Sequence, residues 1–211
     1  MTQKERMILG LEYDAVDKDL AEDRKNAKEL CYDINHTRPS QLEQRKEYIK
    51  KLIGCTGENC YIEPPFYCDY GYNISLGENF YCNHNLVVLD CAEVKIGKNA
   101  FIAPNVGLYT ASHPIEPEKR NTFLENAQPI IIGDNVWIGG GVTVLPGVTI
   151  GDNVVIGGGS VVVKDIPSNV VAVGNPCKVV KELKINQEEL SKSEIDLVSY
   201  KEELLKELKI Y

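Results

Sequence analysis

The sequence predicts a mainly β protein whose central part is a parallel β-helix, with helical segments before and after it. Between Ile130 and Val163, apolar residues recur every six positions. A second set, apolar except for Ser160, lies two positions before each of them, and glycine follows four members of the first set. The members of the first set are Ile132, Ile138, Val144, Ile150, Ile156 and Val162. A six-residue period is the signature of a chain that coils as a β-helix.

Each six-residue unit is interpreted as a short strand followed by a corner. Side chains alternate between the faces of a strand, so Ile130 and Ile132 point inward while Ile131 points outward. The Gly-Asp-Asn that follows Ile132 is turn chemistry. Three units make one triangular coil. The predicted stacking pairs are Ile132 with Ile150, Ile138 with Ile156, and Val144 with Val162. The period leaves the hand of the coil open, and a right-handed crossover is the general default.

Residues 1–54 are polar, and their pattern predicts a helical cap. The apolar positions between Asp19 and Tyr32 fall on about one helical face. A second helix is expected to begin with Ser40 as the N-cap of a capping box and to end at Gly54. Such a cap closes an open end of the solenoid, as terminal units must do. The alternative, that it also contributes contacts to a substrate, stays open.

Residues 55–180 are expected to form the β-helix domain, and the repeat within them is interrupted twice. After Leu86 and Val88 the next inward pair follows eight positions later instead of six, so two extra residues lie near Asp90 and Cys91. Irregularities in a regular solenoid redirect side chains and often mark a functional site.

The second interruption is the excursion loop of residues 109–129, which carries His113. Loops of this length in compact folds are commonly functional. Residues 181–211 change to a helical pattern with leucines seven positions apart. This C-terminal helical extension is expected either to pack on the solenoid or to pair with another subunit.

The composition excludes several classes of protein. The formal net charge of −8 argues against a nucleic-acid partner, which requires a basic face. No run of apolar residues is long enough to span a membrane, and the N-terminus has no apolar signal core, so a cytoplasmic location is expected. The seven cysteines form no CxxC motif and are expected to be reduced, structural thiols.

The chain closely resembles the maltose and galactoside O-acetyltransferases of the hexapeptide-repeat acyltransferase superfamily. The segments that carry the resemblance are YDAVDKDLAEDR (13–24), YIEPPFYCDYGYNISLG (61–77), NFYCNHNLVVLD (79–90), IAPNVGLYTASHPI (102–115) and residues 132–180. The resemblance implies a left-handed β-helix and a homotrimer with active sites at the subunit interfaces. It also implies acetyl-CoA as co-substrate, bound between neighbouring coils, and acetylation of a sugar hydroxyl of a maltose, glucose or galactoside type.

O-acetylation requires a base for the acceptor hydroxyl and a donor for the tetrahedral oxyanion. Histidine suits the first role near neutral pH. Of the three histidines, His113 in Ala-Ser-His-Pro matches the base of the family. Direct attack on the thioester then requires no cysteine or serine nucleophile. The resemblance assigns the backbone N–H of Gly140 to the oxyanion, and it places Asn83 where it orients the acceptor hydroxyl.

The resemblance also implies the substrate contacts. For the acceptor these are Asp69, Tyr81, Asn83, Asp90, Cys91 and Glu125. The galactoside enzymes have two consecutive aspartates at the eight-residue step, and the second is Cys91 here, which favours the maltose-like subset. Asp14 or Asp17 is a further, lower-ranked candidate for a contact with the sugar. For acetyl-CoA the contacts are Trp137, Gly140, Gly158, Val163, Lys164, Lys178 and Lys181. This chemistry needs no metal, and no metal-ligand cluster is expected.

Two other functions remain open. The acceptor could instead be an amino sugar, serine, an antibiotic or a polysaccharide, because one fold and one base serve all of these. A β-helix without catalysis is the second alternative. Its carbonic-anhydrase-like form would need three histidine ligands, and the three histidines here are not spaced for that.

Overall fold

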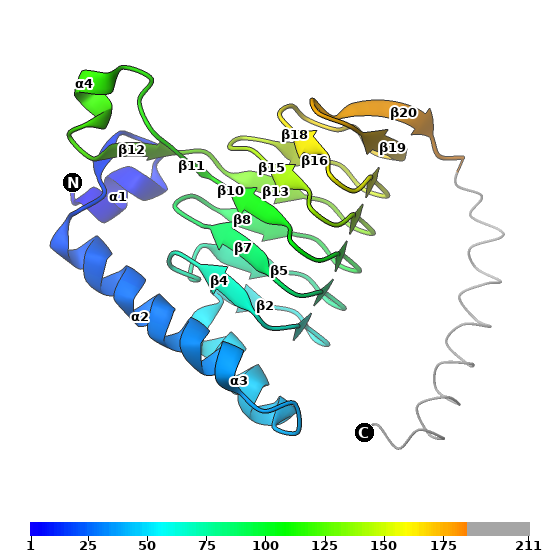
Figure 1. Ribbon diagram of the computed structural model, residues 1–211, viewed down its shortest axis with the longest axis horizontal. Helices are drawn as coiled ribbons and strands as arrows, with labels where there is room; N and C mark the ends of the chain where they lie inside the picture. The colour runs from blue at the N-terminus through cyan, green and yellow to red at the C-terminus, as the bar shows by residue number, and fades with distance from the viewer. Residues whose placement is uncertain (185–211) are drawn as a thin grey trace. The chain divides into compact units, whose positions relative to one another are not determined.

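The computed structural model describes residues 1–184 of the 211-residue chain (Figure 1). Residues Met1–Lys181 form one compact unit. The predicted C-terminal helical extension lies outside the described residues, apart from its first four positions. Two of these, Lys181 and Glu182, end the strand β20 (Lys178–Glu182) instead of beginning a helix. Among the described residues, no helix is long and apolar enough to cross a membrane.

Three parallel sheets form the faces of a β-solenoid, and each coil contributes one strand to each sheet in turn. The first sheet contains β2 (Cys55–Thr56), β5 (Ile74–Leu76), β8 (Val94–Ile96), β13 (Ile130–Ile132) and β16 (Thr149–Ile150). The second contains β3 (Tyr61–Ile62), β6 (Tyr81–Cys82), β9 (Phe101–Ile102), β14 (Trp137–Ile138), β17 (Val155–Ile156), β19 (Val170–Val173) and β20. The third contains β4 (Phe66–Cys68), β7 (Leu86–Leu89), β10 (Gly107–Tyr109), β15 (Thr143–Val144) and β18 (Val161–Val162).

The strand register confirms the predicted stacking. Ile132 pairs with Ile150, Ile138 with Ile156 and Val144 with Val162, all between parallel strands. These inward residues are at most 1% exposed and belong to one continuous core. The six-residue period therefore places each apolar pair on the inside of its coil. The left hand that the resemblance implies stays a prediction.

Asparagine and glycine residues form the corners between the first and second sheets. Six asparagines adopt positive φ there, and the amide Nδ2 of each of the first five donates to Oδ1 of the next at 2.8–3.1 Å. They are Asn59, Asn79, Asn99, Asn135, Asn153 and Asn169. A Cβ on Gly97 would lie 2.6 Å from the backbone of the next coil, so only glycine permits this coil spacing. The corner chemistry thus fixes the distance between coils.

All the irregular segments of the solenoid leave from one edge, between the third and first sheets, which we call the excursion corner. Residues 69–73 connect β4 to β5, residues 90–93 connect β7 to β8, and residues 110–129 connect β10 to β13. The predicted eight-residue step at Asp90 is therefore present. An equal step at Asp69–Asn73, which the sequence analysis did not note, lies directly below it in the previous coil.

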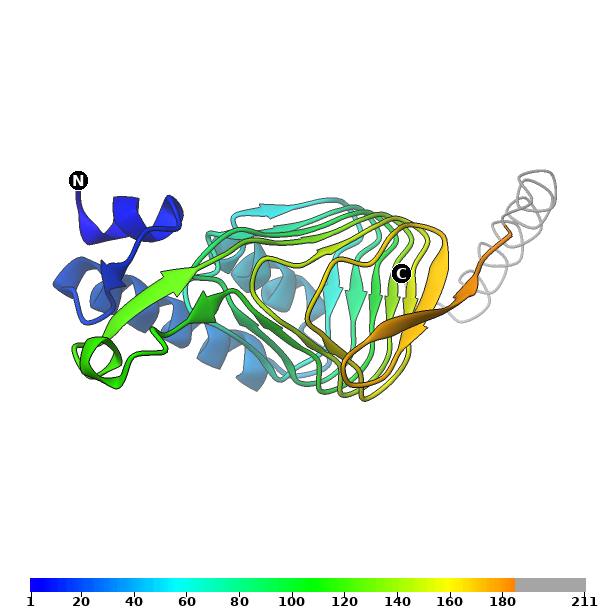
Figure 2. The same ribbon diagram turned by 90° about the horizontal axis from the view of Figure 1, so that it is seen from above.

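The third excursion is an arm with secondary structure of its own. It contains β11 (Ala111–Ser112), the helical turn α4 (Pro117–Arg120) and β12 (Leu124–Ala127), and β11 and β12 pair as antiparallel strands. β12 also pairs with β1 (Tyr13–Asp14) of the N-terminal segment. Figure 2 shows the arm reaching away from the stacked coils toward the N-terminal helices.

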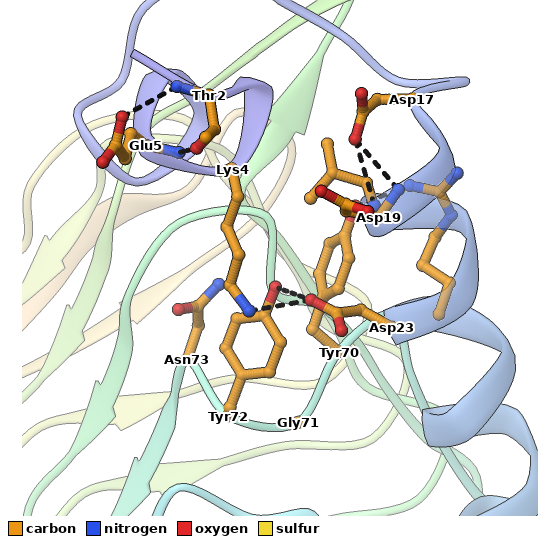
Figure 3. A network of polar contacts seen from close by, with 12 residues as sticks. Thr2, Lys4, Glu5, Asp17, Asp19, Asp23, Tyr70, Gly71, Tyr72 and Asn73 are labelled. Carbon is orange, nitrogen blue, oxygen red and sulfur yellow. Dashed lines mark hydrogen bonds and ion pairs between the residues drawn. The ribbon is translucent and has the colours of Figure 1, made fainter.

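The N-terminal segment contains α1 (Gln3–Ile8), α2 (Lys18–His36) and α3 (Leu42–Leu52). The predicted N-cap at Ser40 is wrong, because α3 has Gln41 at that position without a side-chain hydrogen bond. The capping box lies at α1 instead, where Thr2 and Glu5 bond each other's backbone (Figure 3). α2 packs on α3 and β4, so the segment lies along the coils as well as closing their end (Figure 1).

Candidate active site

A cavity of about 350 Å³ opens at the excursion corner, under the arm. It is lined by Ala15, Val16, Arg24, Lys28, Asp69, Tyr70, Cys91, His113, Phe123 and Glu125. Four of these were predicted as site residues: His113, Asp69, Cys91 and Glu125. They come from all three excursions, which the solenoid brings together by stacking its coils.

The arm positions His113 opposite Glu125. His113 directly follows β11, and Glu125 lies on the antiparallel β12. His113 Nδ1 is 3.4 Å from the carbonyl oxygen of Leu124, and its Nε2 is 3.9 Å from Glu125 Oε1. Because a carbonyl oxygen only accepts, the first contact requires the tautomer with the proton on Nδ1. Nε2 is then the basic nitrogen, on a side chain that is 54% exposed.

The cavity is also lined by a second carboxylate, that of Asp69. The thiol of Cys91 donates to Asp69 Oδ2 across 3.6 Å. Burial raises the pKa of the Cys91 thiol, so the thiol keeps its proton and can donate. Burial also raises the pKa of Asp69, and this is opposed first by the bond from Cys91.

Asp90 has a different place from the predicted one. It is fully buried and does not line the cavity. Its carboxylate accepts three backbone N–H bonds, from Asp69, Tyr70 and Gly71, at 3.1, 2.8 and 2.7 Å. Its oxygens are therefore turned into the fold, so the prediction that Asp90 grips the acceptor is corrected. Asp90 instead fixes the turn that presents Asp69.

The N-terminal segment supplies two cations that the sequence analysis missed. Arg24 and Lys28 are four residues apart on α2, so they share one helix face toward the cavity. The Arg24 guanidinium donates to Tyr70 Oη at 2.6 Å and to the carbonyl of Ala15 at 2.5 Å. The i, i+4 spacing of these two basic residues is the sequence signal that could have indicated their common face. The helical segment thus lines the cavity as well as covering the solenoid.

The two predicted N-terminal aspartates do not line the cavity. Asp17 caps α2, where its carboxylate accepts from the N–H groups of Asp19 and Leu20 (Figure 3). Asp14 accepts from the N–H of Val16 in a local turn. Both carboxylates have structural partners, and their neighbours Ala15 and Val16 form the wall instead.

The remaining predicted residues lie at other parts of the coil. Asn83, Gly140 and Gly158 belong to the corner between the second and third sheets, following β6, β14 and β17. Tyr81 and Trp137 point outward from the second sheet in one row with Phe101. Val163 and Lys164 follow β18 at the excursion corner, and Lys178 and Lys181 are exposed on β20. Asn83, which is expected to orient the acceptor hydroxyl, therefore lies at a different corner of the chain from His113.

Among residues 1–184, no three His, Cys, Asp or Glu side chains are grouped so that they could hold a metal ion. All seven cysteines are free thiols. The Sγ atoms of Cys31 and Cys68 lie 3.8 Å apart, between α2 and β4.

Sequence comparison decides the family. Residues 6–57 match the maltose acetyltransferase hexapeptide capping motif, and residues 129–164 match the bacterial transferase hexapeptide of six repeats. The galactoside O-acetyltransferase of Escherichia coli is 48% identical over 183 residues, which is 87% of this chain and 90% of that protein. The chain belongs to the maltose and galactoside O-acetyltransferase family. A putative acetyltransferase of Saccharomyces cerevisiae, YJL218W, is 56% identical over 85% of this chain and 92% of its own length.

Solved structures of this acetyltransferase family have the same fold. A maltose O-acetyltransferase from Clostridium difficile 630 superposes with a TM-score of 0.87 at 50% identity, covering 88% of this chain and 99% of that one. A galactoside acetyltransferase in complex with coenzyme A gives 0.84 at 48% identity, covering 87% and 92%. The family resemblance read from the sequence is therefore confirmed, and so is the prediction of an acyltransferase.

Proposed function

We propose that this protein transfers an acetyl group from acetyl-CoA to a hydroxyl of a sugar, with His113 as the general base. The observation that carries the proposal is the cavity in which the Nε2 side of His113 faces Glu125, with Asp69 on another wall. Carboxylates and cations around a small open cavity suit an acceptor with several hydroxyl groups. The relatives named for galactoside and maltose O-acetylation, one of them bound to coenzyme A, support the same chemistry.

The reaction would proceed by direct attack. His113 Nε2 takes the proton of the acceptor hydroxyl while the oxygen attacks the thioester carbonyl. The carbonyl oxygen becomes an oxyanion, for which the N–H of Gly140 is the proposed donor. Collapse of the tetrahedral intermediate breaks the C–S bond, and the imidazolium returns the proton to the leaving thiolate. The proposed contacts for acetyl-CoA are Trp137, Gly140, Gly158, Val163, Lys164, Lys178 and Lys181.

A homotrimer is part of the proposal, because one chain leaves the predicted site in two halves. His113 lies at the excursion corner, whereas Asn83 and Gly140 lie at the corner between the second and third sheets. In a cyclic trimer the same two surfaces meet head to tail three times, so one half from each neighbour completes a site. A cytoplasmic location of the protein is also proposed.

The activity is tested by release of CoA from acetyl-CoA with a panel of glucosides, galactosides and maltose. His113→Ala should lower the rate by roughly 10²–10⁴. Wild-type rates in that variant would refute the mechanism. The mass spectrum of the product separates O-acetylation from transfer to the nitrogen of an amino sugar, which is the second candidate.

The shared site is tested by mixing two inactive variants. When His113→Ala and Asn83→Ala chains are coexpressed in equal amounts, about one quarter of the interfaces would combine an intact His113 with an intact Asn83. The mixture should then recover activity to about that fraction of the wild type. Mixtures as inactive as the separate variants would show that both residues serve one chain's site.

A further inference from the structure

Tyr13 is a fully buried phenol that holds one side of Glu125. The two residues are direct neighbours across the antiparallel pair β1–β12. Tyr13 Oη donates to Glu125 Oε2 at 2.6 Å, a short, charge-assisted hydrogen bond. Burial raises the pKa of the phenol, so Tyr13 keeps its proton and remains a donor across the working pH range.

The ring of Tyr13 has little freedom to move. It is 0% exposed and belongs to a separate core cluster under the arm. The other members of this cluster are Met7, Leu20, Tyr70, Cys91, Ala92 and Ala127. They come from α1, α2, two excursions and the arm, so the hydroxyl position is set by all the segments that surround the cavity. A close-packed interior holds such a side chain in one rotamer.

The second oxygen of Glu125 faces the base. Oε1 lies 3.9 Å from His113 Nε2, while Oε2 is occupied by Tyr13. A glutamate has three side-chain torsions and would otherwise lose its orientation on an arm that is only partly buried. The tether removes that freedom and keeps a negative charge beside the nitrogen that becomes positive during proton transfer.

We propose that Tyr13 is a positioning residue for the base: it fixes the carboxylate of Glu125 beside His113, so that Glu125 stabilises the imidazolium formed as the acceptor loses its proton. This inference rests on the proposed function. It assigns the N-terminal segment a part in the chemical step, beyond covering the solenoid. Preorganised charge of this kind lowers the barrier because it needs no rearrangement during the reaction.

The kinetic test removes one oxygen atom. Tyr13→Phe keeps the ring and should lower kcat by roughly tenfold, because the carboxylate is no longer held beside the imidazolium, with an unchanged KM for acetyl-CoA. Tyr72→Phe is the matched control: Tyr72 donates to a carboxylate of Asp23 at 3.1 Å and packs on the same cluster, but does not line the cavity (Figure 3). Its kcat should stay within about twofold of the wild type. Equal losses in both variants would overturn the proposal.

A double-mutant cycle tests whether Tyr13 acts through Glu125. Glu125→Gln should reduce kcat on its own, and adding Tyr13→Phe to it should cost little more, because the oriented charge is already gone. Two losses that multiply would contradict a shared mechanism.

An NMR measurement decides the inference without any acetyl transfer. The chain has three histidines, so the ring signals of ¹⁵N-labelled histidine can be assigned by substitution. The signals of His113 should move in the same direction in Tyr13→Phe and Glu125→Gln and stay in place in Tyr72→Phe. If the His113 signals move in Glu125→Gln alone, Tyr13 has no positioning role. This result is independent of the proposed function, because it holds even if the protein acetylates no sugar.

Discussion

Replacing Cys91 by aspartate would place two carboxylates together on the wall of the cavity. Cys91 is 3% exposed, and its sulfur lies 3.6 Å from Asp69 Oδ2. An aspartate at this position would hold its oxygens at about the same distance. With an effective dielectric constant of about 20, two negative charges at that separation repel by about 4–5 kcal/mol.

The pair can avoid this repulsion by binding one proton in the folded state. Holding a proton on a carboxyl whose ordinary pKa is about 3.9 costs about 1.5 kcal/mol near pH 5 and more than the repulsion itself near pH 8. The folded variant therefore binds more protons than the unfolded chain, so its free energy of unfolding falls as the pH rises. Between about pH 5 and pH 8 the Cys91→Asp variant should lose about 3 kcal/mol relative to Cys91→Ser.

Urea unfolding at both pH values, at one protein concentration, measures this difference. Cys91→Ser is the control, because its hydroxyl still donates to Asp69 without adding charge. The double variant Asp69→Ser/Cys91→Asp carries a single carboxylate and should lose the extra pH dependence. The reasoning is refuted if Cys91→Asp and Cys91→Ser show the same change in unfolding free energy between the two pH values.

Three further predictions concern the fold. Burial raises the pKa of Asp90 to about 6 against the pull of its backbone amides. The folded chain then binds more protons than the unfolded chain between about pH 4 and pH 6, and stability falls as the pH rises through that window. Asp90→Asn should abolish this part of the pH dependence in urea titrations, and an unchanged profile would contradict it. Gly97→Ala should cost about 3 kcal/mol, because its Cβ would lie 2.6 Å from the backbone of the next coil. Gly159→Ala, with open space around the Cβ and only a φ of +71° to strain it, should cost about 1 kcal/mol by chemical denaturation. Oxidation with diamide should join Cys31 to Cys68 before any other pair, since their sulfur atoms are 3.8 Å apart, and peptide mapping by mass spectrometry would show a different pair if this is wrong.

Much of the solenoid could be read from the periodic pattern. The residue pairs that stack in neighbouring coils follow from counting, because strand, corner and coil all have fixed lengths in a regular repeat. The step at Asp90 also follows from counting, and the same arithmetic from Phe66 to Ile74 shows the second step, which was overlooked. Local signals were weaker: the expected cap at Ser40 is absent, because a capping pattern does not show whether the backbone around it begins a helix.

By itself, the sequence determined the coil and its interruptions, because each is a property of residues close together in the chain. It also made His113 the candidate base through a recognisable motif, and that role stays a proposal. Only the tertiary structure decided that the three excursions leave from one corner, because the chain between two excursions must complete a whole coil for this to happen. It turned the carboxylate of Asp90 into the fold, where it accepts three backbone N–H bonds, and brought Arg24 and Lys28 to the cavity wall. It also joined Tyr13 to Glu125, residues 112 positions apart that meet only because β12 of the arm pairs with the N-terminal strand.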